Sequence, residues 1–115
     1  MSVSAATVKD VSNCEFSLRI SEAKHIPIGV YSGEGPSGTV RVNSVGEGAV
    51  LALRDDSNPI IAGDYLTVCK SRRGYVEKAK TQQMSKWVVG KAIVDVEWDD
   101  EDEMEKLIPV VYTCG

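Results

Sequence analysis

The chain has 115 residues, of which 43% are hydrophobic and 26% charged, and its formal net charge is −4. This size and composition predict one folded domain with a single core and argue against wholesale disorder. No apolar run approaches the roughly 20 residues of a membrane span, and the first residues lack the basic and apolar regions of a secretion signal. We therefore expect no membrane partner, and a protein that stays in the compartment where it is made.

The N-terminal residues 1–13 are small and polar with scattered valines. This predicts an extended N-terminal arm rather than a packed element. We expect a single β domain over residues 14–115. It begins with CEFSLRIS, residues 14–21, where apolar and polar side chains alternate strictly, as in a half-buried strand.

Glycine and proline punctuate the next segment, residues 25–59. Pro27 indicates an edge or irregular strand over residues 26–31, and SGEGPSG predicts a loop. The alternating TVRVNSV predicts another strand, and GEGAVLAL a turn followed by a further strand. Each glycine cluster leads into a β-branched run instead of a helix N-terminus, so we interpret the clusters as turns and not as phosphate-binding loops.

Residues 60–79 predict a two-stranded hairpin in which SRRG joins YLTVCK to YVEKA. Gly74 ends this connection and is able to take positive φ. Before the first strand, Gly63 stands where the chain turns, and Asp64 can accept backbone N–H bonds that fix the turn. The hairpin is therefore predicted to serve the shape of the domain.

The longest predicted strand runs over residues 87–98, and one of its faces is almost wholly apolar. Gly90 within this bulky strand indicates a bend or the close approach of another backbone. With Gly63, Asp64 and Gly74, it completes the set of predicted structural turn positions.

The C-terminal part combines an acidic segment with a last strand. DDEDEMEK, residues 99–106, is predicted to be a loop because like charges repel and stay solvated. LIPVVYTCG then predicts a strand in which Pro109 lies near an edge or a bulge. The predicted fold is all-β: a small single-domain β-barrel or sandwich, β-tulip-like, with seven or eight short strands and an extended N-terminal arm.

Charge is distributed unevenly along the chain. Residues 95–105 contain eight acidic residues and no basic one, so a net charge of −4 leaves +4 for the rest. Residues 70–80 contain five basic residues and one acidic residue, Glu77. Because no aromatic side chains interleave with these cations on one face, we interpret the basic hairpin as a solvated strand pair and expect no nucleic-acid partner. The acidic segment lacks the Asp-x-Asp-x-Asp-Gly spacing of a calcium loop, which leaves weak Ca²⁺ binding as a minor alternative.

No pattern of side chains predicts catalysis. His25 is the single histidine and has no nucleophile motif beside it. The cysteines Cys14, Cys69 and Cys114 are widely spaced, and no pair resembles half of a zinc site. We therefore expect no catalytic residue, no metal and no cofactor. The cysteines are expected to be small buried side chains, with a bridge between the first and the last left open.

Four short motifs follow one another between residues 62 and 112. They are Ala62-Gly63-Asp64, Gly74-Tyr75-Val76 with Lys78-Ala79, Val89-Gly90-Lys91-Ala92-Ile93, and Ile108 with Val110 to Tyr112. In this order they resemble the motifs of bacteriophage head decoration proteins, also called capsid cement proteins. Upstream, IPIGVYSGEG and GTVRVNSVGEGAVLAL are similar to the opening strands of that family, so the resemblance covers roughly residues 26 to 112.

The resemblance implies a non-enzymatic virion protein that binds the major capsid protein, as a homotrimer, on the outer surface of the assembled head and stabilises the shell. Such a protein is made in the host cytoplasm and needs no cofactor. The resemblance also implies that the N-terminal arm contacts the capsid, and we name Val3, Thr7, Val8 and Val11 as the candidate contact residues. The acidic residues 99–103 are not part of the family pattern.

Two other functions remain as alternatives. The same motifs occur in terminal domains of phage tail spikes and fibres, which makes a trimeric structural module of a tail the first alternative. The second is a carbohydrate-binding or enzymatic β domain. It would need aromatic platforms, for which the chain offers Trp87, Trp98 and four tyrosines.

Overall fold

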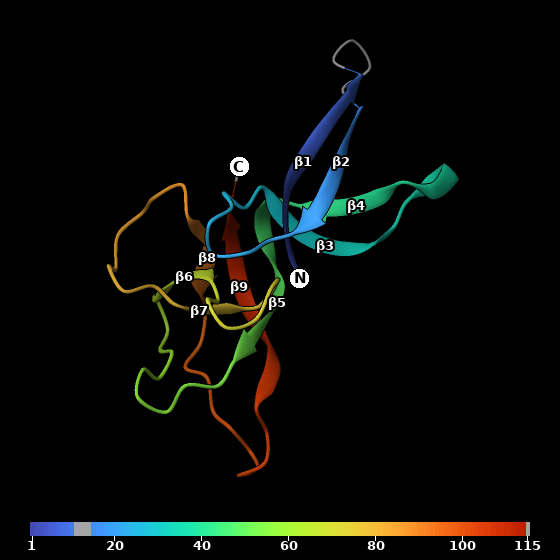
Figure 1. The fold of residues 1–115 in the computed structure, drawn as a ribbon. Coiled ribbons are helices and arrows are strands. Elements are labelled where there is room, and N and C mark those ends of the chain that lie inside the picture. The colour runs from blue at the N-terminus through green and yellow to red at the C-terminus, as the bar shows by residue number, and fades with distance from the viewer. Residues whose placement is uncertain (11–14, 115) are drawn as a thin grey trace.

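The computed structural model describes residues 1–10 and 15–114, and in these residues the protein is all-β (Figure 1). The strands are β1 (Ser2–Asp10), β2 (Glu15–Ile20), β3 (Gly29–Glu34), β4 (Val40–Asn43), β5 (Val45–Leu53), β6 (Tyr65–Val68), β7 (Val76–Lys78), β8 (Val88–Ala92) and β9 (Glu105–Thr113). A single 3₁₀ turn, η1 (Pro36–Gly38), is the one helical element of the described residues, and none of these residues forms a helix long and apolar enough to cross a membrane. The predicted all-β class is confirmed, with nine strands instead of seven or eight.

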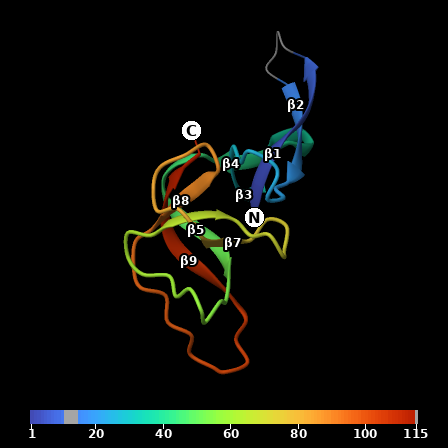
Figure 2. The same ribbon diagram turned by 60° about the vertical axis from the view of Figure 1, so that its left-hand side comes forward.

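The strands form a closed barrel and a separate sheet. The barrel has the order β5-β7-β6-β8-β9, and the antiparallel sheet has the order β2-β1-β3-β4. The hairpins β1–β2 and β3–β4 project away from the barrel (Figures 1 and 2). The molecule is accordingly elongated, with extents of 47 × 27 × 25 Å. The core fills the barrel.

Alternation along the barrel strands supplies this core. In β9, Ile108, Val110 and Tyr112 point inward and are buried. Full burial of such side chains contributes roughly 1.5–3 kcal/mol each. The other members of the core cluster are Val30, Val50, Ala52, Ile60, Leu66, Val68, Val76, Val89 and Ala92.

The longest strand pair, β5 with β9, explains one of the glycine clusters. Residues 46–48, predicted to be a turn, lie inside β5 and pair with β9. A Cβ on Gly48 would lie 2.4 Å from ring atoms of Tyr112, so the ring occupies the space that a side chain would fill. The Tyr112 hydroxyl also donates to the carbonyl of Ala49 (2.6 Å) and accepts from its N–H (2.9 Å). The glycine therefore serves packing across the sheet, and the turn prediction was wrong here.

The strand predicted over residues 87–98 ends at Ala92. Ala92 pairs with Val110, and the next partner on β9 would be Pro109, which has no N–H to continue the ladder. The chain leaves the barrel at this point, with a single bond from the Ile93 N–H to the Pro109 carbonyl (3.2 Å). Val94, on the apolar face of the predicted strand, is consequently 45% exposed.

The N-terminal segment is extended, as expected, but its first residues are packed. Ser2 and Val3 pair with β3, and the Ser2 N–H donates to the carbonyl of Gly74 in the barrel (3.0 Å). The buried hydroxyl groups of Ser4 and Ser21 lie 2.7 Å apart and form a hydrogen bond. The start of β1 is thus part of the joint between sheet and barrel.

This packing bears on the candidate capsid-contacting residues. Val3 is 6% exposed, so very little of its side chain lies on the surface of this fold. Thr7 and Val8 lie in β1, opposite Ser17 and Phe16 of β2. Val11 lies outside the described residues. A contact of this segment with a capsid remains a prediction.

Candidate functional site

The turn before β6 is fixed by the residues predicted for it. Gly63 has φ +92°, and its N–H donates to the Ala92 carbonyl (2.8 Å). Oδ2 of the buried Asp64 accepts from the Ile61 N–H (2.9 Å) and forms an ion pair with Lys78 Nζ (3.1 Å). These groups hold the shape of the turn.

Gly74 and Gly90 meet close neighbours. Gly74, at φ +79°, bonds through its N–H to the Ser21 carbonyl (2.8 Å), and a Cβ there would lie 2.9 Å from a methyl carbon of Ile20. Gly90 is not at a turn but inside β8, where a Cβ would lie 2.7 Å from the Val111 carbonyl oxygen. Its role is the close approach of β8 and β9.

The surface over β6 and β7 is concave and basic. Three adjoining hollows of about 200, 400 and 310 Å³ share Lys70, and two of them share Glu77, Lys78 and Lys80. We call them together the basic hollow. Its charged lining residues are Lys24, Lys70, Arg72, Arg73, Lys78 and Lys80 with the acidic Glu22, Asp55 and Glu77.

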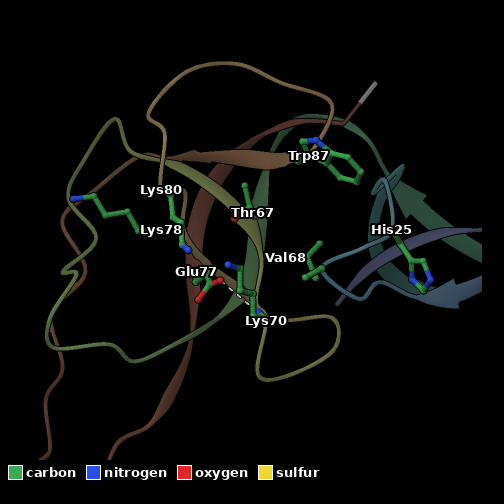
Figure 3. A pocket seen from close by; sticks show the side chains of 9 residues that line it. His25, Thr67, Val68, Lys70, Glu77, Lys78, Lys80 and Trp87 are labelled. Carbon is green, nitrogen blue, oxygen red and sulfur yellow. Dashed lines mark hydrogen bonds between the residues drawn. The ribbon is translucent and has the colours of Figure 1, made fainter.

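Lys70 and Lys80 lie beside Glu77 at the centre of this surface (Figure 3). The Glu77 carboxylate accepts from the Lys70 backbone N–H (3.3 Å) and from the Cys69 thiol (3.9 Å). Among the described side chains, no carboxylate lies within ion-pair distance of the Lys70 or Lys80 ammonium group. The neighbouring Lys70 ammonium group lowers the pKa of Lys80, because two positive charges close together disfavour the protonated form. An anion placed here would relieve this repulsion.

His25 and Trp87 stand on the other side of the hollow (Figure 3). His25 Nδ1 accepts the Glu22 N–H (3.1 Å), so the ring fixes its own loop, and the Lys86 ammonium group lies over the Trp87 ring, 5.1 Å from its centre. No group of three or more potential ligands for a metal ion occurs in the part of the chain that the structure describes.

Two cysteines are described, and both are free thiols. Cys69 is buried, and the thiol of Cys114 donates to the Val89 carbonyl (3.1 Å). Burial raises the pKa of the Cys114 thiol to about 11. At neutral pH this thiol is protonated and therefore a poor nucleophile.

Arg54 organises the acidic loop, which we define as residues 99–103. One guanidinium nitrogen, Nη1, donates to the carbonyl groups of Asp100 (3.0 Å), Glu101 (3.3 Å) and Glu103 (3.2 Å). These bonds fix the loop backbone and leave the loop carboxylates unneutralised by this cation. No local pattern signals this role of Arg54, because the residue lies 46 positions before Asp100.

A stripe of apolar side chains runs along the outer face of β5 and β9. Leu107 is 62% exposed and Val111 38% exposed. Leu51 pairs with Leu107, and Ala49 pairs with the exposed Pro109. We call these residues the apolar stripe: Ala49, Leu51, Leu107, Pro109 and Val111. Apolar residues on both faces of LIPVVY were a sequence signal for it, since a strand facing water on one side alternates with polar residues.

Four aromatic rings are each covered by a cation of the chain. The pairs are Trp87 with Lys86, Trp98 with Arg54, Tyr65 with Lys91, and Tyr75 with Arg72. None of these rings therefore has both faces open, and this arrangement does not favour the aromatic platform that a carbohydrate site uses.

Comparison of the chain with protein families, with curated proteins and with solved structures finds no match.

Proposed function

We propose that this protein is a non-enzymatic capsid decoration protein that binds the outer surface of an assembled phage head as a homotrimer and stabilises the shell. The proposal starts from the four motifs that resemble the decoration family. They correspond to consecutive parts of one barrel: the turn before β6, the start of β7, strand β8 and strand β9. These four motifs therefore fall in one folding unit, whereas the upstream part of the resemblance includes β3 and β4 of the separate sheet.

The observation that carries the proposal is the apolar stripe on the outside of this barrel. Leu107 alone leaves 62% of its surface exposed, and Val111 lies two residues further along the same strand face. Contiguous apolar side chains on a protein surface mark interaction sites. We assign the stripe to the contact with the major capsid protein.

The mechanism is thermodynamic. A ligand that binds the assembled shell and not its separated subunits stabilises the shell by mass action. A trimer strengthens this effect, because once one copy is bound the other two meet their sites at high effective concentration. Stabilisation of this kind requires a contact surface that matches the shell in area and shape, and it uses no catalytic group.

The test is to mix the purified protein with expanded heads and to measure saturable binding and the temperature at which the heads break. We expect binding to saturate at a fixed number of copies per head and to raise this temperature. A Leu107→Asp variant should bind at least about tenfold more weakly, a loss of about 1.4 kcal/mol. Absence of binding at every stage of shell maturation would refute the proposal.

A further inference from the structure

The basic hollow holds positive charge that its own chain does not neutralise. Lys78 and Arg72 have partners, Asp64 and Glu105. Among the described residues, the ammonium groups of Lys70 and Lys80 have no carboxylate within ion-pair distance, although they lie near each other. Glu77 lies beside them, and its single negative charge offsets only part of their two positive charges. The centre of the hollow is thus complementary to an anion.

The acidic loop has an excess of negative charge. Asp99 has a partner, Lys106, but Asp100, Glu101, Asp102 and Glu103 have none among the described cations. Glu101 and Asp102 are exposed at the turn of the loop. The hydrogen bonds from Arg54 already fix the loop backbone, so docking would cost little further ordering of the chain.

The loop and the hollow occupy different parts of the molecule. The acidic loop lies at the end of the barrel remote from the β1–β2 hairpin, whereas the hollow lies over β6 and β7 and extends to the loop around His25 (Figures 1 and 3). Because the basic hollow and the acidic loop lie at separate places on one chain, their complementary charges favour contact between copies. Each copy then contacts one neighbour through its loop and another through its hollow.

We propose that the basic hollow binds the acidic loop of a second copy of this chain, with Glu101 and Asp102 placed against Lys70 and Lys80. The contact is head-to-tail, so it closes into a ring where the rotation between copies permits. This inference deepens the proposed function, because it rests on the homo-oligomer and names the contact between its copies.

Charge reversal tests the contact in the purified full-length protein. The hollow variant is Lys70→Glu/Lys80→Glu, and the loop variant is Glu101→Lys/Asp102→Lys. The control is Lys86→Glu/Lys91→Glu, which changes the net charge as the hollow variant does but outside the hollow lining. Sedimentation velocity at about 50 mM and about 500 mM salt measures association, because screening shortens the reach of charges over this range.

We expect the wild-type protein and the control to associate at low salt, with a dissociation constant that rises at least about tenfold at high salt. Each reversed variant alone should associate at least about tenfold more weakly, because the two substituted side chains then face two side chains of the same sign of charge across the proposed contact. A mixture of the two variants should associate again into open chains or rings with an even number of copies, since every contact between different variants then pairs opposite charges, whereas a ring of three would keep one contact between like charges. If Lys70→Glu/Lys80→Glu fails to fold, Lys70→Ala/Lys80→Ala takes its place, without the mixing step.

Three results would overturn the inference. They are a monomeric wild-type protein at low salt, a dissociation constant that these substitutions leave unchanged, and a mixture of the two variants that stays dissociated. Binding of a short single-stranded oligonucleotide that depends on Lys70 and Lys80, with self-association unchanged, would assign the hollow to another anion instead. Head binding is measured separately. If the protein binds heads but its self-association does not depend on these charges, this inference alone is contradicted. If its self-association depends on these charges but it does not bind heads, the proposed function alone is contradicted.

Discussion

The Nζ atom of Lys78 lies 3.1 Å from Oδ2 of Asp64, and this ion pair ties β7 to the turn that opens β6. Asp64 is 8% exposed, and its carboxylate also accepts the Ile61 N–H. The residue that fixes the turn therefore also links it to the neighbouring strand.

Replacement of Asp64 by alanine should destabilise the fold by about 1–3 kcal/mol, because the Ile61 N–H loses its acceptor and the Lys78 ammonium group loses its partner. Urea denaturation measures the change. Glu34→Ala removes an exposed carboxylate from β3 and serves as the control, with an expected change within about 0.5 kcal/mol. Equal effects of the two substitutions would contradict this role of Asp64.

Gly74→Ala should destabilise the protein more than Gly38→Ala. The two glycines have nearly the same φ, +79° and +77°, so both substitutions carry the cost of a left-handed residue, about 1–2 kcal/mol. An added Cβ has no neighbour within 4 Å at Gly38, but at Gly74 it would lie 2.9 Å from Ile20. The difference between the two unfolding free energies therefore measures the steric cost of an added methyl group between barrel and sheet. A difference of zero would show that the neighbouring side chains move aside at no cost.

Arg54→Met should loosen the acidic loop. The substitution removes the guanidinium group that binds three carbonyl oxygens of this loop. Cleavage by a glutamate-specific protease at Glu101 and Glu103 should become at least about fivefold faster, because the loop opens more often. Arg41→Met, on the exposed face of β4, is the control and should leave the cleavage rate unchanged.

The stability of the protein should fall as pH rises from about 9 to about 11, in part through Cys114. Burial raises the pKa of this thiol to about 11, whereas a thiol in the unfolded chain has a pKa of about 8.5. The unfolded chain therefore loses this proton first, and rising pH favours unfolding. Thermal denaturation of wild type and Cys114→Ala over this range isolates the contribution: the variant should show a shallower decline, and identical slopes would contradict the raised pKa.

Leu107→Asp should leave the fold intact. The side chain is 62% exposed, so the free energy of unfolding should change by less than about 0.5 kcal/mol. Val110→Asp, three residues along β9 and fully buried, should prevent folding, because it places an unpaired charge in the core. Denaturation curves of the two variants check this difference, and a large loss of stability in Leu107→Asp would mean that the apolar stripe serves the fold and not a partner.

Local pattern was sufficient for the fold class and for several details. The alternation in YLTV puts Leu66 and Val68 on one face, which the structure buries, and Gly63 and Gly74 have the positive φ that their positions in the sequence suggested. Such features depend on a few neighbouring residues, because a strand has period 2 and a tight turn needs a glycine.

What the sequence by itself determined is the all-β class, most of the strand positions and the separation of basic and acidic segments. The tertiary structure alone decided that β8 ends where Pro109 faces it, that Val3 is buried, and that Arg54 holds the acidic loop. It also brought Lys70 and Lys80 together in one hollow. These features join residues far apart in the chain, and their partners are chosen by strand register and barrel closure, which no local pattern specifies.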